Sequence, residues 1–352
     1  MELEKIKEWT EEVITWEELE KLITGGGRVR GYIGVEPSGR FHIGWIIWVD
    51  VLRLLQRMGV EMTVLLATWH ALINDKLGGD IKRIRACAEY IKACLEALGA
   101  ENVKYIYAEE LIGRREYWER VIRISKCLTL ARVKRAMTIM GRTEKEASLD
   151  FSKCLYPPMQ VSDIFELDVD IALGGMDQRR AHVLAREVAE KMKWKKVVAV
   201  HTPLLIGLEG VGRMDVAALS REEVRIQGKM SKSKPETAVF IDDSPEDIKR
   251  KIRKAFCPPG EVENNPVLEI CKYIVFRRLD EMHIERPDKY GGPVTYSSYL
   301  ELERDYVERK LHPADLKSGT AEALIKILEP VRDKLSRHKD LVAAIREAEI
   351  TR

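Results

Sequence analysis

Lysine side chains gather in one short segment of small residues, Lys229 to Lys234, which reads KMSKSK. Lysine ammonium groups on such a loop can neutralise the negative charge that develops on a transferred or departing phosphate. Taken alone, the segment is more typical of a flexible charged linker. Its interpretation as part of a phosphate-handling site therefore depends on a second segment that could bind a nucleotide.

Such a segment runs from Gly31 to Gly44 and reads GYIGVEPSGRFHIG. Its apolar start, its Pro-Ser-Gly break and the long apolar run that follows predict a strand, a turn and a helix N-terminus. A helix N-terminus presents unpaired N–H groups and a partial positive charge, which suits a phosphate. Gly44 would let a nucleotide approach the backbone, and the His42 ring could reach a phosphate oxygen. An ordinary strand–loop–helix connection has the same pattern.

Three hydrogen-bonding side chains, Tyr156, Gln160 and Asp163, follow one another at helical spacing. The spacing i, i+4, i+7 places them on one face of a helix, and Pro157 and Pro158 fit its first turn. This pattern predicts the wall of a polar pocket. For Tyr156 and Gln160 an exposed helix face is an equally good interpretation.

A second strand-to-helix connection follows at once, where an apolar run ends at Gly174-Gly175 and continues through Asp177. Adjacent glycines at such a connection allow a ligand to meet the backbone closely. The carboxylate of Asp177 could accept hydrogen bonds from ribose hydroxyls.

The segments that must position these residues alternate between strands and helices. Strands are predicted at 28–35, 62–67 and 103–107, with helices at 45–58 and 80–98 between them. This alternation predicts a doubly wound parallel sheet, which binds ligands at the carboxyl ends of its strands. The loops after the first two strands, which carry Glu36 and His70, should then line one crevice.

The remaining segments are predicted from composition and start signals. Residues 1–26 and 113–142 are predicted as helices, 196–200 as the last strand, and 207–228 as an irregular surface segment. A basic face on residues 128–142 would contact RNA only if it lay beside the crevice. From Asp242 onward helices dominate, and Ser244-Pro245 is a strong helix start.

Composition restricts the class of protein. The chain has 352 residues, 45% hydrophobic and 33% charged, which predicts a globular protein of two or three domains. A net charge of +2 means that any affinity for nucleic acid must come from local basic patches. The six cysteines show no metal-ligand spacing and suit a reducing cytosol. We expect a cytoplasmic protein without a membrane segment, because the longest apolar run, 43–55, is too short to span a bilayer.

Together, His42-Ile43-Gly44 and the KMSKS segment resemble the paired HIGH and KMSKS motifs of class I aminoacyl-tRNA synthetases. Trp45 stands where a final histidine is common, and its role is open. The closer resemblance is to tyrosyl-tRNA synthetases of the archaeal and eukaryotic type. It extends from YIGVEPSG through YPPMQVSDI, GGMDQR and KMSKSK to KYGG and HPADLK. It implies a Rossmann-like doubly wound parallel sheet with a helical insertion, followed by an all-α C-terminal anticodon-binding domain.

The resemblance also implies the reaction and its residues. L-Tyrosine would be joined to tRNA(Tyr) in two steps, through a tyrosyl-adenylate made from ATP. ATP with Mg²⁺ would enter as substrate, and no tightly bound metal or organic cofactor is expected. The implied catalytic residues, which stabilise the pentacoordinate phosphate and the leaving pyrophosphate, are His42, Lys229 and Lys232. The implied ATP-binding residues are Gly34, His42, Gly44, Gly174, Asp177, Met230, Ser231, Lys232 and Ser233.

In that family a tyrosine and an aspartate hold the phenol hydroxyl of bound tyrosine, and they are similar to Tyr32 and Asp163. A buried phenol O–H needs an acceptor, and an ionised aspartate is a strong one. Such a site should reject phenylalanine, as tyrosyl-tRNA synthetases are known to do. The rest of the implied tyrosine site comprises Glu36, His70, Tyr156, Gln160 and Gln178.

The RNA contacts and the assembly are implied in the same way. Residues similar to Arg135, Arg179 and Arg180 read the acceptor stem, and residues similar to Tyr290, His312 and Asp315 read the first anticodon base. For Asp315, helix capping after Pro313 is the alternative. Relatives are homodimers, and residues 110–160 resemble their dimer-forming insertion. The expected domains are 1–228 (catalytic), 229–243 (KMSKS loop and linker) and 244–352 (anticodon-binding).

Three other functions remain open at this point. A tryptophanyl-tRNA synthetase shares both motifs, although an indole N–H does not need two hydroxyl-type partners such as Tyr32 and Asp163. A small nucleotidyltransferase would lack the helical region after Asp242. A synthetase-like RNA-binding protein without catalysis is disfavoured by the presence of both His42 and the KMSKS loop.

Overall fold

The computed structural model describes residues 2–137, 150–211 and 221–350, which form two compact units. The first unit comprises residues up to Gly39, Trp48–Pro203 and the chain from Asp340 onward. The second comprises Arg40–Ile47 and Leu204–Lys339. The predicted functional domains are continuous ranges of sequence, whereas these units are not, so the predicted domain limits stay a prediction.

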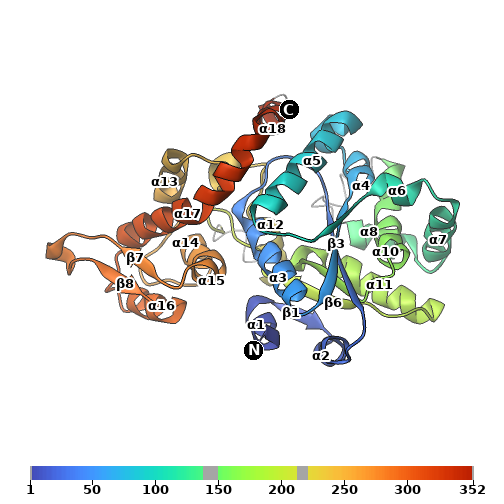
Figure 1. The fold of residues 1–352 in the computed structure, drawn as a ribbon, viewed down its shortest axis with the longest axis horizontal. Coiled ribbons are helices and arrows are strands. Elements are labelled where there is room, and N and C mark those ends of the chain that lie inside the picture. The colour runs from blue at the N-terminus through green and yellow to red at the C-terminus, as the bar shows by residue number, and fades with distance from the viewer. Residues whose placement is uncertain (1, 138–149, 212–220, 351–352) are drawn as a thin grey trace. The chain divides into compact units, whose positions relative to one another are not determined.

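A six-stranded sheet is the centre of the first unit (Figure 1). Its order is β1-β6-β5-β2-β3-β4, and all neighbours are parallel except β1, which runs antiparallel to β6. The strands are β1 (Glu12–Ile14), β2 (Val29–Val35), β3 (Val60–Leu66), β4 (Lys104–Tyr107), β5 (Ile171–Gly175) and β6 (Val198–Thr202). From β2 the chain proceeds to β3 and β4, then returns to β5 on the other side of β2. This reversal makes the carboxyl ends of β2 and β5 the expected place for a ligand.

Helices connect the strands of this unit. They are α1 (Glu2–Trp9), α2 (Trp16–Thr24), α3 (Ile46–Arg57), α4 (Thr68–Ile73), α5 (Ile81–Ala97), α6 (Ala108–Ile112), α7 (Arg115–Lys126), α8 (Leu130–Met137), α10 (Tyr156–Glu166), α11 (Arg179–Met192) and α18 (Lys339–Ile350). The division between the units falls inside α3. One buried cluster joins strand residues Tyr32 and Leu65 to Tyr117 on α7, Met159 on α10 and Leu184 on α11. The cluster fixes α7 and α10 against the sheet.

The second unit is mainly helical. Its helices are α12 (Arg221–Gly228), α13 (Pro245–Lys254), α14 (Pro266–Ile270), a π-helical turn at Cys271–Val275, α15 (Phe276–Arg278), α16 (Tyr299–Val307) and α17 (Pro313–Leu335). The predicted helix start at Ser244 is confirmed, because its side chain accepts a hydrogen bond from the Asp247 N–H. A two-stranded antiparallel hairpin, β7 (Met282–Ile284) and β8 (Val294–Tyr296), interrupts the helices. At Gly319 of α17 an added Cβ would come within 2.6 Å of Ile284, so this glycine permits close packing on the hairpin.

The predicted parallel sheet and the helical C-terminal region are confirmed, and three local predictions are wrong. Residues 1–26 do not form one helix, because Thr15 caps α2 in a capping box with Glu18 and β1 pairs with β6. Residues 221–228 are helical rather than irregular. The C-terminal region is not all-α as expected, because it contains the hairpin β7–β8, whose three-residue strands give too short an alternation to recognise. Residues 138–149 and 212–220, parts of the predicted insertion and surface segment, lie outside the described residues.

Among the described residues, no helix is long and apolar enough to cross a membrane.

Candidate functional site

The first unit contains an almost completely buried carboxyl group. Asp163 on α10 is 2% exposed, and its Oδ1 accepts a hydrogen bond from the Tyr117 hydroxyl over 2.8 Å. Its Oδ2 lies 3.2 Å from Nε2 of His70 on α4. We call Tyr32, His70, Tyr117, Tyr156 and Asp163 the carboxylate pocket. Three helices and strand β2 supply these side chains, so the pocket depends on tertiary packing.

Residues 156, 160 and 163 lie on one helix, α10, as predicted. Helix α10 begins at Tyr156, with Pro157 and Pro158 in its first turn. Tyr156 is buried, and its ring contacts the His70 ring edge-on at a centroid distance of 4.9 Å. The exposed-face alternative is therefore wrong for Tyr156. Gln160 is half-buried and donates through Nε2 to Oε1 of Gln178 over 2.9 Å.

Burial controls the protonation of the carboxylate pocket. It raises the pKa of Asp163 to about 8, against the opposing effect of the Tyr117 hydrogen bond. Burial lowers the pKa of His70 to about 4, so the imidazole is neutral at pH 7. Burial and the charge of Asp163 raise the pKa of Tyr32, which keeps its hydroxyl protonated. The pocket thus presents neutral phenol and imidazole groups around one carboxyl group.

This raised pKa gives a prediction for stability. A carboxyl group whose pKa is 3.8 when unfolded and about 8 when folded stabilises the fold fully below pH 3.8. That contribution is lost as the pH rises through 8. Asparagine cannot titrate, so we expect wild type to lose stability relative to Asp163→Asn between pH 5 and pH 8. Urea unfolding without tyrosine measures this difference.

The matched control for that experiment is Asp168→Asn, since Asp168 is exposed and pairs with Arg30. Its stability difference from wild type should not follow the same pH dependence. A stability difference between wild type and Asp163→Asn that stays constant from pH 5 to pH 8 would show that Asp163 is already ionised in the folded protein at pH 5.

Tyr117 is the pocket residue that sequence reasoning missed. It lies on α7, is fully buried, and donates to Asp163 from 46 positions earlier in the chain. Its helix has an ordinary amphipathic pattern, in which a buried tyrosine is indistinguishable from a core residue. A buried hydroxyl needs a hydrogen-bond partner, but nothing local identifies which one.

The other predicted tyrosine-site residue, Glu36, lies in the loop after β2. Its Oε1 accepts a hydrogen bond from Asn74 over 3.0 Å, and its Oε2 lies 3.9 Å from Nζ of Lys76. Glu36 and Asp163 both contribute to the raised pKa of Tyr156. The charge of Glu36 therefore acts on Tyr156, in addition to the larger effect of burial on that hydroxyl.

The glycines of the first unit have different environments. Gly34 is exposed in β2. At Gly174 an added Cβ would come within 2.9 Å of Gln178 Cβ and 3.0 Å of His182 Cε1. Close packing of the following turn thus requires glycine at 174. The turn carries Asp177 and Gln178 in a short 3₁₀ helix, Met176–Gln178, directly after β5.

A buried chain of polar groups joins the N-terminal strand to α11. His182 and His201 approach each other at 3.0 Å between Nδ1 and Nε2, and His201 Nδ1 lies 2.9 Å from Oε2 of Glu12. Glu12 also accepts two hydrogen bonds from Arg179 Nε, at 2.9 and 3.0 Å. The predicted RNA contact Arg179 is thus ion-paired in this structure. Arg180 is half-buried beside it, and Arg135 is exposed on α8.

In the second unit, His42 lies in a buried and rigid setting. It forms an antiparallel bridge with Phe240, and Ile43 N–H donates to Val239 O over 2.9 Å. Burial and the charges of Lys232 and Lys229 lower its pKa well below the usual value, so the ring is neutral. At Gly44 an added Cβ would come within 3.0 Å of His42 Nδ1. This glycine is required by the packing of the His42 ring, a reason the sequence did not reveal.

The lysine loop, residues 229–234, begins on a fixed backbone. Lys229 bridges Ile206, and buried Met230 donates to Leu205 O over 2.7 Å. Beyond Met230, Ser231 Oγ accepts from the Ser233 N–H over 3.3 Å, and Lys234 pairs with Glu209.

Trp45 has a contact that gives it a role. Nζ of Lys232 lies 4.5 Å from the centroid of its ring, and the centroid of the His42 ring lies 5.6 Å from that of Trp45. A cation over an indole face is attracted by about 0.5–2 kcal/mol. A tryptophan at this position can therefore hold the lysine loop cation near His42, which a histidine would do less well.

The predicted anticodon residues occupy two neighbouring loops of the second unit. Tyr290 is 61% exposed before Gly291, in the connection of the hairpin. His312 caps α17, where its Nδ1 accepts from the Ala314 N–H over 3.2 Å, so Asp315 is not the capping residue. Arg286 joins the two loops by donating to Gly292 O and to Lys310 O. An exposed aromatic ring such as that of Tyr290 suits stacking by an unpaired base.

Comparison with known proteins identifies the family. The family model described as tRNA synthetases class I (W and Y) matches residues 24–219 and 222–329. The chain is 56% identical over 326 residues to the tyrosine–tRNA ligase of Aeropyrum pernix, covering 92% of this chain and 90% of that one. It is 52% identical over 349 residues to that of Sulfolobus acidocaldarius, covering 97% and 96%. The chain belongs to the archaeal-type tyrosyl-tRNA synthetases of class I.

Solved structures agree with this assignment. The tyrosyl-tRNA synthetase of Pyrococcus horikoshii, complexed with L-tyrosine, matches with a TM-score of 0.90 and 44% identity, covering 99% of this chain and all of that one. A tryptophanyl-tRNA synthetase from Aeropyrum pernix matches at 21% identity and a TM-score of 0.66, a likeness of fold alone. The tryptophanyl and non-catalytic alternatives are thus not supported.

Proposed function

We propose that the chain attaches L-tyrosine to tRNA(Tyr) at the expense of ATP, with the residues assigned below. The tyrosine carboxylate attacks the α-phosphate of ATP, and pyrophosphate leaves with its bonding electrons. A terminal ribose hydroxyl of the tRNA then attacks the carbonyl of the adenylate, and AMP leaves. The observation that carries the choice of amino acid is a fully buried carboxyl group, Asp163, amid neutral phenols.

Asp163 and Tyr32 would hold the phenol hydroxyl of the substrate. Asp163 Oδ1 accepts from Tyr117, which leaves Oδ2 as the oxygen for a second donor. Oδ2 faces the neutral His70 ring, so a substrate O–H would compete with an imidazole rather than with a cation. A hydroxyl buried without a partner costs about 1–3 kcal/mol, and Oδ2 would supply that partner.

The amino end of tyrosine would meet Tyr156, Gln160 and Gln178, with Glu36 supplying negative charge. The Gln160–Gln178 hydrogen bond fixes both amides before substrate arrives. Fixed groups lose less conformational entropy on binding, which favours affinity.

The nucleotide step would use His42, Lys229 and Lys232. Because His42 is neutral, it would stabilise the phosphate by donating a hydrogen bond rather than by charge. The two lysines supply the positive charge that pyrophosphate needs as it leaves. Mg²⁺ would arrive with ATP and keep most of its ligands as phosphate oxygens and water. Gly34, Gly44, Gly174, Asp177, Met230, Ser231 and Ser233 are the remaining proposed ATP contacts.

The partners follow from the same proposal. Large apolar side chains are exposed in the proposed dimer-forming insertion, namely Trp118, Ile122, Leu130 and Phe151. Such side chains together favour a protein interface. A homodimer would have twice the 40.4 kDa of one chain in light scattering, and a species of 40.4 kDa would contradict it.

The experiment that tests the function is exchange of labelled pyrophosphate into ATP with tyrosine, tryptophan or phenylalanine, followed by charging of tRNA(Tyr). Exchange with tyrosine alone is expected. Exchange with tryptophan would overturn the assignment of the pocket. Absence of exchange in a folded protein that still binds tRNA would overturn the enzymatic proposal.

For the RNA contacts, Asp315→Ala should raise the KM for tRNA(Tyr) about fivefold. The reason is the loss of one hydrogen bond of about 1 kcal/mol to the anticodon. Pyrophosphate exchange should stay at the wild-type level, because that step does not need tRNA. Asp280→Ala, at an exposed position of the second unit, is the control. An unchanged KM for tRNA would remove Asp315 from the anticodon site.

A further inference from the structure

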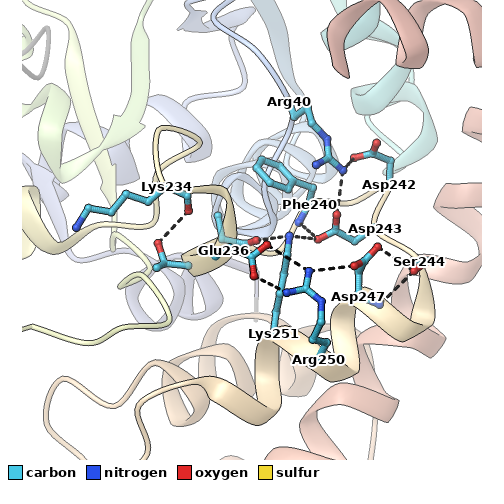
Figure 2. A network of polar contacts seen from close by, with 12 residues as sticks. Arg40, Lys234, Glu236, Phe240, Asp242, Asp243, Ser244, Asp247, Arg250 and Lys251 are labelled. Atoms are coloured by element: carbon cyan, nitrogen blue, oxygen red, sulfur yellow. Dashed lines mark hydrogen bonds and ion pairs between the residues drawn. The ribbon is translucent and has the colours of Figure 1, made fainter. Parts of the chain in front are cut away.

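A buried cluster of four charged side chains lies beside the nucleotide residues of the second unit. Lys251 on α13 donates to Asp243 over 2.7 Å, and Arg40 donates to Asp242 and Asp243 over 2.8 and 2.9 Å. Figure 2 shows these side chains gathered around Phe240. Arg40 Cζ lies 3.9 Å and Lys251 Nζ 4.8 Å from the Phe240 ring centroid. We call Arg40, Asp242, Asp243 and Lys251 the buried ion cluster.

The burial of this cluster separates it from ordinary surface ion pairs. The Lys251 and Asp243 side chains are 4% and 5% exposed, and those of Arg40 and Asp242 are 13% and 6% exposed. Charges so far from water are costly unless they are paired and hydrogen-bonded. Two cations and two carboxylates balance one another here. Such a set tolerates few alternative arrangements, and it therefore fixes the backbone that carries it.

The backbone it fixes is that of His42. Residues 41–43 and 239–241 pair antiparallel, with Ile43 N–H donating to Val239 O and Ile241 N–H donating to Phe41 O. Arg40 directly precedes the first of these segments, and Asp242 and Asp243 directly follow the second. Asp243 Oδ2 also accepts from the Phe240 N–H over 2.9 Å. The cluster thus closes the open end of a two-strand pairing whose centre is His42 and Phe240.

The same cluster reaches the end of the lysine loop. Lys251 Nζ donates to Ala238 O over 2.9 Å, and the preceding Thr237 O accepts from the Leu208 N–H over 2.8 Å. Thr237 N–H in turn donates to Lys234 O over 3.0 Å. One buried lysine of α13 therefore holds the chain after the lysine loop, at Ala238, two residues before Phe240, which bridges to His42.

We propose that Arg40, Asp243 and Lys251 are positioning residues for the nucleotide step. They hold His42 and the exit of the lysine loop in one fixed relation, so that the phosphate-stabilising groups need not reorganise during the reaction. This inference rests on the proposed roles of His42 and Lys232. It makes no demand on the carboxylate pocket, which belongs to the other unit.

The test uses Arg40→Gln, Arg40→Lys and Lys251→Met in the full chain, with steady-state pyrophosphate exchange, tyrosine binding by calorimetry and thermal unfolding. We expect kcat to fall roughly ten- to hundredfold in Arg40→Gln and Lys251→Met, because small misplacements of catalytic groups have effects of this size. The kcat of Arg40→Lys should lie between those of these two variants and that of wild type, because lysine keeps the charge but lacks the planar guanidinium. Tyrosine affinity should be unchanged in all three.

The matched control is Arg250→Gln, one position before Lys251 on α13. Arg250 also pairs with two carboxylates, Glu236 and Asp247, but its side chain is 37% exposed (Figure 2). Exposed pairs contribute little, so this variant should keep wild-type kcat. Equal losses in Arg250→Gln and Lys251→Met would overturn the special role of the buried cluster.

A purely structural role predicts a different result. Variants would melt at lower temperature, yet show wild-type kcat and KM for ATP while folded, and that outcome overturns the proposal. If Lys251→Met does not fold, Asp243→Asn with Lys251→Met removes both charges together, which is milder than leaving one unpaired. A folded double variant with wild-type kcat would likewise overturn it. Full activity of His42→Ala would contradict the proposed nucleotide site itself. Full activity of the ion-cluster variants alone would contradict only their positioning role, so the two results are distinguishable.

Discussion

Asp163→Ala is expected to lower kcat/KM for tyrosine in pyrophosphate exchange by about ten- to hundredfold. The variant leaves the buried hydroxyl of the substrate without its acceptor, which costs about 1–3 kcal/mol, and each 1.4 kcal/mol is a factor of ten. The cavity left by the carboxyl group and the orphaned Tyr117 hydroxyl act in the same direction. The kcat/KM for phenylalanine should not fall in parallel. The ratio of kcat/KM for tyrosine to kcat/KM for phenylalanine should therefore decrease.

The control for this variant is Asp168→Ala, five residues further along and exposed. It should retain wild-type exchange with each amino acid. Wild-type kinetics with tyrosine in Asp163→Ala would show that another group recognises the phenol. A fall with tyrosine and phenylalanine alike would mean that Asp163 supports the pocket without reading the hydroxyl.

His42→Ala should lower kcat for exchange by about 10²–10³, the range found when one preorganised hydrogen-bond donor to a developing charge is removed. The KM for tyrosine should change little, because the carboxylate pocket is built from other elements. Since the pKa of His42 lies well below its usual value, the wild-type ring is neutral at pH 7. The loss should therefore be similar at pH 7 and pH 8, rather than following a histidine titration.

His283→Ala is the control, since His283 is an exposed histidine of the hairpin that hydrogen-bonds to Thr295. It should exchange pyrophosphate like wild type. A His42→Ala variant within twofold of wild type would exclude His42 from the transition state. Lys232→Ala would then become the decisive variant for the same step.

The sequence could predict what depends on local pattern. The 3.6-residue period placed Tyr156, Gln160 and Asp163 on one face, and the strand–helix alternation predicted the sheet that holds them. Charged and turn residues marked the start of α13 at Ser244. These features are encoded within one or two turns of chain, where propensity and spacing are informative.

Features that depend on distant packing could not be predicted in this way. Tyr117 reaches Asp163 from another helix, and Glu12 reaches His201 from a segment predicted as helix. Gly44 was assigned to nucleotide approach, yet the structure shows the His42 ring in the space its side chain would need. For Asp163 and His201 the decisive neighbour is far away in sequence, so no local pattern records it. For Gly44 the neighbour is two residues away, but residues 41–43 are held by their pairing with residues 239–241.

The short N-terminal strand has a further consequence for how the molecule behaves in solution. A long strand at the border of a sheet offers unpaired N–H and C=O groups to other molecules and promotes aggregation. Here β1, only three residues long, covers β6, and the opposite border is β4, with four. The seven-residue strands β2 and β3 lie inside. The enzyme thus keeps its longest and most apolar strands away from partners that would add to the sheet.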